Sequence, residues 1–312
     1  MLGSCGPSEK DLSGSNEVLR LITLDPGHFH AALVQKIIYP EVDSKVHIYA
    51  LAGNDLQLHL ARIENFNGRR EQPTIWESIV YRGPDFLEKM LEEKKGNVVV
   101  LAGNNRNKTA YVLKAVSNGF HVLADKPMAI NQKDFMMLEK AFAVAKEKKL
   151  LLYDIMTERF EITTMLQKEL SKMPVIFGTL EKGSPENPAV TKESVHHFYK
   201  FVSGKPLIRP PWFFDTEQEG DGPVDVTTHL VDLIQWECFS GESLDYKRDI
   251  IIYNARHWPT PILLSEFREV TALEDYPEYL LKDVEGDNML MVFCNGEIKY
   301  QIKGIHASVS VT

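Results

Sequence analysis

Residues 19–38 carry the sequence LRLITLDPGHFHAALVQKII, which decides the fold of the first half of the chain. The apolar run at 19–24 is typical of a β-strand, Asp25-Pro26-Gly27 of a turn, and 29–38 has helical spacing of apolar side chains. The same alternation continues to about residue 155, with strands predicted at 46–51, 97–102, 120–124 and 150–153 and helices at 56–66, 84–95, 108–117 and 132–148. Apolar strands separated by helices predict a parallel sheet covered on both faces, a doubly wound α/β domain.

The second half of the chain has a different pattern. We predict a strand at 175–180, a helix at 229–238, and a hairpin of strands 289–294 and 297–302 joined at Asn295-Gly296, because Asn-Gly supplies the positive φ angles of a tight turn. With a further strand at 306–311, this predicts an α+β domain with a largely antiparallel open sheet. We expect a flexible tether at 1–17, the doubly wound domain at 18–155 and the second domain at 156–312. Because the last strand reaches the final residue, we also expect a chain truncated at its C-terminus.

Composition narrows the class of partner. The chain has 312 residues, 44% of them apolar and 25% charged, which is typical of a globular protein rather than a disordered or fibrous one. The net charge of -9 argues against electrostatic binding of nucleic acid. No apolar run reaches the roughly 18 residues that a membrane span requires. A small-molecule partner is the prediction.

The three cysteines are too few and too scattered for a disulfide framework or a CxxC zinc site. Cys5 differs from the others, because Leu2-Gly3-Ser4-Cys5 has the order of a bacterial lipobox, in which the cysteine is acylated after signal cleavage. Only Met1 precedes this pattern, and a polar tether follows it. A trimmed envelope lipoprotein and an accidental match are equally good interpretations of four residues.

The turn after the first strand is the place where a dinucleotide fingerprint would put three glycines. Gly27 alone is present, Pro26 lacks an N–H, and His28 adds bulk, so phosphate binding must be looser or differently arranged. A purely structural Asp-Pro-Gly turn is the alternative. His28 and His30 could be metal ligands, but we see no acidic or cysteine partner placed to complete a site, so we predict no metal and expect these histidines at the surface or facing a ligand.

Polar residues also follow the next strands. Asp55 comes 28 residues after Gly27, later than the acidic residue that grips an NAD ribose, and no Arg or Lys stands beside it, so NAD and NADP stay equally open. After the strand at 120–124, Asp125-Lys126-Pro127 places Lys126 at the strand tip, because a proline cannot continue a strand. The alternative for this lysine is a solvated loop position.

A third motif opens the helix of the second domain. Asp225 and His229 are four residues apart and His229 and Asp232 three apart, so at helical spacing they share one face. An Asp and a His that meet a Lys form a proton-transfer set, with the histidine titrating near neutral pH. The alternative is an aspartate N-cap followed by a core histidine.

Asp125-Lys126-Pro127, followed at this separation by Asp225-x-x-x-His229-x-x-Asp232, resembles the glucose-fructose oxidoreductase and inositol dehydrogenase (Gfo/Idh/MocA) family across residues 18–312. The resemblance implies a Rossmann domain that binds NAD or NADP, and an oxidoreductase acting on a sugar, polyol or related carbohydrate. It also implies His229 as general base, Lys126 orienting the substrate oxygen, and Asp225 positioning the histidine or binding a neighbouring hydroxyl. The sequence departs from the family pattern at three places. The glycine turn is reduced to Gly27, and Asp125 stands where glutamate is usual. The family's usual Thr-Pro-Asn-x-x-His turn is replaced by Gly103-Asn104-Asn105-Arg106-Asn107-Lys108.

Two sets of contacts are implied as well. The cofactor would contact the turns after the strands, at Asp25, Gly27, His28, Phe29, His30, Asn54, Gly103, Asn104, Asn105, Asp125, Lys126 and Pro127. Candidate substrate contacts are Glu158, Arg159, His196, His197 and Trp212. A plain packing role is the alternative for Trp212.

The Asp-Pro-Gly-His-Phe-His turn is similar to that of a Bacteroides-type subgroup with a distinctive C-terminal domain and often a lipoprotein signal. This implies acylation of Cys5 and a place in the periplasm or cell envelope, with the cytoplasm as alternative. We also expect a homo-oligomer formed through the C-terminal sheet. Two alternative functions keep the fold: a catalytically silent sugar- or nucleotide-binding lipoprotein, and an enzyme that modifies glycosides while recycling a tightly held cofactor.

Overall fold

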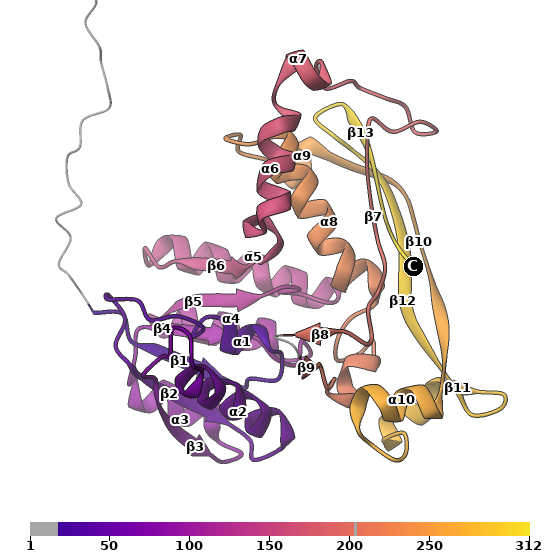
Figure 1. Cartoon of the computed structure of the whole chain (residues 1–312). Helices are drawn as coiled ribbons and strands as arrows, with labels where there is room; N and C mark the ends of the chain where they lie inside the picture. Colours follow the sequence, from indigo (N-terminus) through magenta and orange to yellow (C-terminus); the bar gives the residue numbers. More distant parts are fainter. Residues whose placement is uncertain (1–17, 203–204) are drawn as a thin grey trace, which may run out of the picture.

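The structure, a computed structural model, describes residues 18–202 and 205–312, so Cys5 and the whole predicted tether at 1–17 lie outside the described residues. A parallel sheet and a mixed sheet stand side by side, with helix α8 between them (Figure 1). The first half of the chain contains β1 (Leu21–Leu24), α1 (His30–Leu33), β2 (Lys45–Ala50), α2 (Asn54–Gly68), β3 (Glu77–Arg82), α3 (Phe86–Glu93), β4 (Val98–Leu101), α4 (Lys108–Ser117), β5 (His121–Asp125), α5 (Gln132–Glu147) and β6 (Leu152–Ile155).

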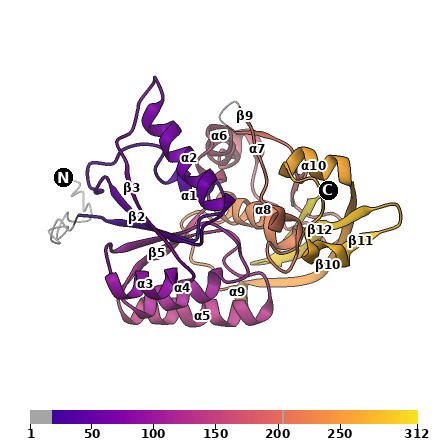
Figure 2. The ribbon, with the colours of Figure 1, turned by 90° about the horizontal axis from the view of Figure 1, so that it is seen from below.

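The first sheet is parallel throughout, in the order β3-β2-β1-β4-β5-β6. Helices α3, α4 and α5 lie on one face and α1 and α2 on the other (Figure 2), which confirms the predicted doubly wound domain. The central strand β1 is buried along its whole length. Because the strand order reverses between β1 and β4, the turns that follow these two strands face each other at the carboxyl edge of the sheet.

Two elements of this half differ from the prediction. Helix α1 has a single turn instead of spanning 29–38, and the carbonyl of Gln35 accepts a hydrogen bond from the Trp76 indole at 2.6 Å. Strand β3 escaped the sequence analysis because it is an exposed edge strand with polar residues at both ends, which leaves an apolar run of only three residues.

The second half contains a short 3₁₀ segment at Glu158–Phe160, α6 (Ile162–Ser171), α7 (Pro174–Phe177), β7 (Val190–Ser194), β8 (Phe201–Val202), β9 (Lys205–Pro206), a 3₁₀ segment at Pro211–Phe214, α8 (Gly222–Cys238), α9 (Tyr246–Asp249), β10 (Ile250–Leu263), α10 (Leu264–Thr271), a 3₁₀ segment at Glu278–Asp283, β11 (Val284–Glu285), β12 (Met289–Ile302) and β13 (Ile305–Val311). The second sheet has the order β10-β12-β13-β7, with β11 beside β12, and is antiparallel except where β13 pairs with β7. The predicted fold class, a doubly wound sheet followed by a largely antiparallel open sheet, is thus confirmed. Leu230 and Ile234 of α8 pack against Tyr300 and Val309 of the sheet.

The strand predicted at 175–180 is wrong. Residues Pro174–Phe177 form the one-turn helix α7, and proline at its first position suits a helix start because the missing N–H has no intrahelical partner there. In the described part of the chain, no helix combines the length and the apolar character needed to cross a membrane.

The hairpin predicted at Asn295-Gly296 is also wrong, because both residues lie inside the continuous strand β12. The chain turns instead at Lys303-Gly304, where both residues have positive φ. Gly296 allows α8 to lie close to β12, because a Cβ at this position would be 2.3 Å from Cγ of Pro223 at the start of α8. Glycine here lets the first turn of α8 rest directly on the sheet.

Candidate active site

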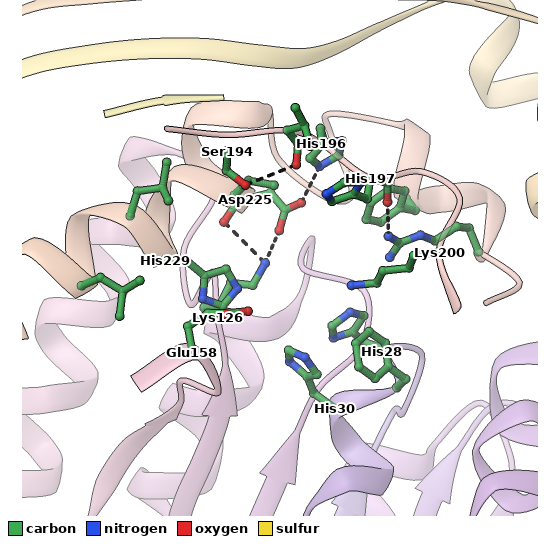
Figure 3. Close-up of a pocket in the computed structure, with 17 residues that line it drawn as sticks. His28, His30, Lys126, Glu158, Ser194, His196, His197, Lys200, Asp225 and His229 are labelled. Atoms are coloured by element: carbon green, nitrogen blue, oxygen red, sulfur yellow. Dashed lines mark hydrogen bonds and ion pairs between the residues drawn. The ribbon is translucent and has the colours of Figure 1, made fainter. Parts of the chain in front are cut away.

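A cavity of about 320 Å³ lies at the carboxyl edge of the parallel sheet, beneath α8 (Figure 3). Its walls come from the turn after β1, the residue after β5, the segment that follows β7, and α8. The residues lining it are His28, Phe29, His30, Lys126, Glu158, Ser194, Val195, His196, His197, Lys200, Arg209, Phe213, Asp225, Val226, His229, Leu230 and Leu233. The three predicted catalytic residues, Lys126 of the first half of the chain and Asp225 and His229 of α8, therefore line one cavity.

Lys126 and Asp225 form a buried ion pair at the centre of this cavity. Lys126 Nζ donates to Asp225 Oδ1, and it lies 3.4 Å from the backbone carbonyl of the same residue. Burial disfavours the charged lysine, but the carboxylates of Asp225 and then Asp125 outweigh it and raise the pKa of Lys126. Although burial alone would raise it, Lys126 and His196 hold the pKa of Asp225 well below its usual range. The pair is charged at neutral pH.

The histidine that binds Asp225 is His196, which differs from the sequence prediction. His196 Nε2 donates to Asp225 Oδ2 at 2.9 Å, and its ring stacks on Phe213 with the planes 5° apart. Burial opposes the charge, but hydrogen bonding to Asp225 leaves the pKa of His196 raised. Asp225 accepts hydrogen bonds from Lys126 and His196, and among the described residues no hydrogen bond joins it to His229, although helical spacing places both on α8.

His229 faces the cavity from α8 with its Nδ1 buried and without a hydrogen-bond partner among the described residues (Figure 3). Burial, and then the positive charge of Lys126, lower the pKa of His229 to about 3. The imidazole is therefore neutral at neutral pH. It can accept a proton, but the driving force for that transfer is small while Lys126 remains charged beside it.

His28 and His30 share one carboxylate, that of Asp125. Their Nδ1 atoms lie 2.7 Å and 2.9 Å from the two oxygens of Asp125, and the two rings meet edge to face with centroids 4.2 Å apart. Burial lowers the pKa of His28 to about 3. Burial would raise the pKa of Asp125, but the two histidines hold it well below its usual range. The sequence analysis found no acidic partner for these histidines, and this was wrong, because the turn after β1 reaches Asp125, which ends β5 at the same edge of the sheet.

Lys108 and Arg209 support the site and escaped the sequence analysis. Lys108 Nζ donates to the side-chain oxygen of Asn105 and lies 3.2 Å from the backbone carbonyls of Asp125 and Pro127, the two residues that flank Lys126. A cation at the start of a helix is opposed by the helix dipole, so a lysine opening α4 was a signal of an outside partner. Arg209 donates to the carbonyl of His197 at 2.6 Å and thereby holds the segment that carries His196.

The second domain holds the turn after β4. Asn104 Nδ2 donates to Gln218 Oε1 at 2.7 Å, and Asn105 Nδ2 donates to Glu219 Oε2 at 2.9 Å. Both asparagines therefore bind the segment before α8. Gly103 lies beside the turn after β1, where a Cβ on it would be 2.1 Å from the carbonyl oxygen of Asp25.

These contacts close the crevice in which an open α/β sheet holds a dinucleotide. The amides of Gly27 and His28 donate to the carbonyl of Ala102 at 3.1 Å and 3.0 Å, so they are not free to bind a phosphate. Burial, and then the Asp55 carboxylate, raise the pKa of Asp25 to about 6, which leaves it predominantly ionised at neutral pH. The turn thus offers negative charge where a pyrophosphate needs donors.

Trp212 covers the outer side of the same turn. Its indole N–H donates to Asp55 Oδ2 at 2.7 Å, and a Cβ on Gly27 would lie 3.0 Å from its ring. Trp212 was a candidate substrate contact, but it lies on this turn and does not line the cavity. In this arrangement the turn residues do not fit a pyrophosphate, and a nucleotide needs Trp212 to move away from Gly27.

The remaining predicted residues divide into two groups. Phe29, Glu158 and His197 line the cavity, as expected of ligand contacts. Arg159 does not line it, because its guanidinium forms an ion pair with Asp232, the third residue of the helix motif. Asn54 is exposed at the first position of α2.

Two family descriptions match the chain. Residues 44–154 match "Oxidoreductase family, NAD-binding Rossmann fold", and residues 166–312 match "Putative oxidoreductase C terminal domain". The first match begins after the turn at 25–30. A search of the curated proteins found no match.

Solved structures with the same fold are also similar to this chain, and one of them is similar in sequence. A "putative oxidoreductase" from Parabacteroides merdae is 57% identical with a TM-score of 0.91, covering 95% of this chain and 67% of that one. The WlbA dehydrogenase from Bordetella pertussis, solved with NADH and UDP-GlcNAcA, is 15% identical with a TM-score of 0.54, over 94% of this chain and 72% of that one. A "putative myo-inositol dehydrogenase" from Sinorhizobium meliloti is 13% identical with a TM-score of 0.55, over 94% and 69%. The chain belongs to the oxidoreductase family with an NAD-binding Rossmann fold, the Gfo/Idh/MocA family.

Proposed function

We propose that the protein is an oxidoreductase acting on a CH–OH carbon of a sugar, polyol or related carbohydrate, with NAD or NADP as redox partner. The observation that carries this proposal is the charged Lys126–Asp225 pair inside a polar cavity at the carboxyl edge of the sheet. Membership of the oxidoreductase family supplies the reaction class. Enzymes place their substrates at this edge of an open α/β sheet.

The lining of the cavity favours a carbohydrate. Lys126, Lys200 and His229 offer donors, Glu158 offers an acceptor, and the ring of Phe29 supplies an apolar face. A sugar has hydroxyl groups around its edge and an apolar face of C–H groups, so it can satisfy both kinds of surface. The volume of about 320 Å³ falls at the lower end of the range for small-molecule sites, which is roughly 300–1,000 Å³.

The side chains have distinct roles in this proposal. Lys126 donates a hydrogen bond to the reacting oxygen and stabilises the negative charge that develops on it, while Asp225 holds the ammonium in place. His229 receives the hydroxyl proton in its neutral form, and its basicity rises once the charge near Lys126 is neutralised by the developing alkoxide. His196 is a positioning residue, because it acts through Asp225.

A nucleotide titration tests the redox part. The protein purified without added nucleotide is denatured and the supernatant assayed for NAD(H) and NADP(H), and the native protein is then titrated with each. Stoichiometric nucleotide, or saturable binding, followed by oxidation of a carbohydrate from a panel, is the expected result. A protein that binds nucleotide and oxidises no carbohydrate or polyol at any concentration would refute the substrate class.

A carbohydrate-binding protein without redox turnover is the second candidate. The closed crevice at Gly27 favours it, because the amides that would bind a pyrophosphate already donate to Ala102. Calorimetric titration with the same carbohydrate panel in the absence of nucleotide separates the two. Carbohydrate binding together with no nucleotide binding would favour this candidate over the first.

Location and assembly complete the proposal. Acylation of Cys5 and a place in the cell envelope are tested by metabolic labelling with a fatty acid, with Cys5→Ser as the unlabelled control. A homo-oligomer through the second sheet is supported by exposed apolar residues on β10, among them Ile251 and Ile252 at 57% and 63% exposure. Light scattering of Ile252→Lys against the unchanged protein tests it, and a mass equal to one chain in both would refute it.

A further inference from the structure

Three potential metal ligands gather at one wall of the cavity. His28 and His30 come from the turn after β1, and Asp125 is the last residue of β5, about 95 residues later in the chain. Each can offer one ligand atom, and these atoms all lie within 4.8 Å of one another. In the described part of the chain, no other group of three or more His, Cys, Asp or Glu residues meets the same condition.

The separations match those of ligands on a common ion. His28 Nδ1 lies 2.7 Å from one Asp125 oxygen, and His30 Nδ1 lies 2.9 Å from the other. Two atoms that each bind a metal at about 2.0–2.2 Å, with a right angle between the bonds, are about 3 Å apart. An ion could therefore replace the hydrogen-bonding protons with small side-chain movements.

The burial and the negative charge of Asp125 also favour a bound cation. The Asp125 side chain is 2% exposed, and the groups that its carboxylate contacts directly are the imidazoles of His28 and His30. Lys126 and Lys108 act on this carboxylate through their charge and, within the described ranges, form no ion pair with it. A buried carboxylate is normally paired with a cation or bound to a metal, because desolvation of an unpaired charge is costly. Two imidazoles and a carboxylate are the ligand types that zinc and similar divalent ions prefer.

We propose that His28, His30 and Asp125 bind one divalent transition-metal ion of the zinc class at the wall of the cavity. Three protein ligands leave at least one coordination position for water or substrate, as in catalytic zinc sites. Both histidines line the cavity, so this position is accessible to a bound molecule (Figure 3). The ion would bind a hydroxyl or carbonyl oxygen of the carbohydrate, a role that rests on the proposed function, whereas the metal site itself does not.

Zinc titration of the full chain tests the site. The protein is treated with EDTA, dialysed, and titrated calorimetrically with Zn²⁺ without substrate or nucleotide, and Co²⁺ is then followed by visible absorption. We expect one equivalent bound, with affinity reduced at least 100-fold in His30→Gln and in Asp125→Asn. His306→Gln, which changes a histidine on β13 outside this cluster, is the matched control and should bind as the unchanged protein does.

A measurement on the unchanged protein covers the case in which these variants do not fold. Histidines are modified with diethylpyrocarbonate with and without Zn²⁺, and the modified peptides are identified by mass spectrometry. Zinc should protect His28 and His30 and leave His306 reactive. The proposal is overturned if no equivalent of Zn²⁺ binds more tightly than millimolar, if the folded variants bind as the unchanged protein does, or if zinc leaves His28 and His30 unprotected. None of these outcomes involves nucleotide or carbohydrate, so they are independent of the proposed reaction.

Discussion

Replacing Trp212 by phenylalanine should open the crevice at Gly27 to nucleotide. The indole N–H donates to Asp55 at 2.7 Å, and the ring lies against the turn on which a pyrophosphate would rest. Phenylalanine keeps most of the ring and removes the hydrogen bond. The arrangement that excludes nucleotide is then destabilised, while the backbone of the turn is unchanged.

The size of the effect follows from the hydrogen bond. A hydrogen bond to a charged group contributes about 1.5–3 kcal/mol net, and its loss also leaves the half-buried Asp55 carboxylate without that donor. A change of about 2 kcal/mol corresponds to roughly 30-fold in an equilibrium constant. If the closed arrangement dominates, the apparent affinity for NADH should rise by this factor, because it is scaled by the fraction of open molecules.

The assay is calorimetric titration of NADH and NADPH into both proteins, with the melting temperature recorded to show that the variant is folded. Trp236→Phe is the matched control, since this residue lies on α8 with its ring against Lys168 and away from the turn. Unchanged affinity in Trp212→Phe would show that this contact does not exclude nucleotide. Weaker binding would refute the reasoning, because Trp212 would then be a nucleotide contact.

Three further predictions concern activity and stability. Lys126→Met should lower kcat/KM on an identified substrate by roughly 100-fold or more while circular dichroism stays unchanged, and near-normal turnover would exclude its role. Burial raises the pKa of Asp25 to about 6, so its contribution to stability is complete below about pH 4 and is lost as the pH rises through 6. Asp25→Asn should therefore raise the free energy of unfolding at pH 8 by on the order of 2 kcal/mol. Urea unfolding of both proteins at pH 5 and pH 8 measures this difference. Gly296→Ala should destabilise by about 1–3 kcal/mol through contact with Pro223, whereas Gly68→Ala, where a Cβ meets nothing within 4 Å, should not, and equal melting temperatures for the two would contradict the packing.

The centre of the parallel sheet was predictable because its strands are short, mainly apolar and separated by helices. Residues 21–24 and 98–101 have one stable arrangement, a strand buried on both faces. Apolar runs of this kind indicate whether a segment is a strand or a helix, but they do not fix where the element ends, as the one-turn helix α1 shows. The exposed edge strand β3 carried no such signal.

The hairpin at Asn295-Gly296 shows where local sequence misleads. Asn-Gly favours a tight turn, but the same glycine also permits the close approach of Pro223, and only the packing of α8 on the sheet selects between the two. In the site, Lys126, Asp225 and His229 were found from their motifs, and they do line one cavity. Their partners were not found, because His196 reaches Asp225 from a segment without a spacing pattern.

The sequence by itself determined the alternation of strands and helices, the family, and the two motifs around Lys126 and Asp225, since each depends on residues close together in the chain. The tertiary structure alone decided that Asp125 joins His28 and His30, that His196 rather than His229 holds Asp225, and that Trp212 covers Gly27. The physical reason is that a hydrogen bond needs its donor and acceptor atoms to lie about 3 Å apart in space. Residues separated by tens of positions come that close only after the sheets and α8 have packed.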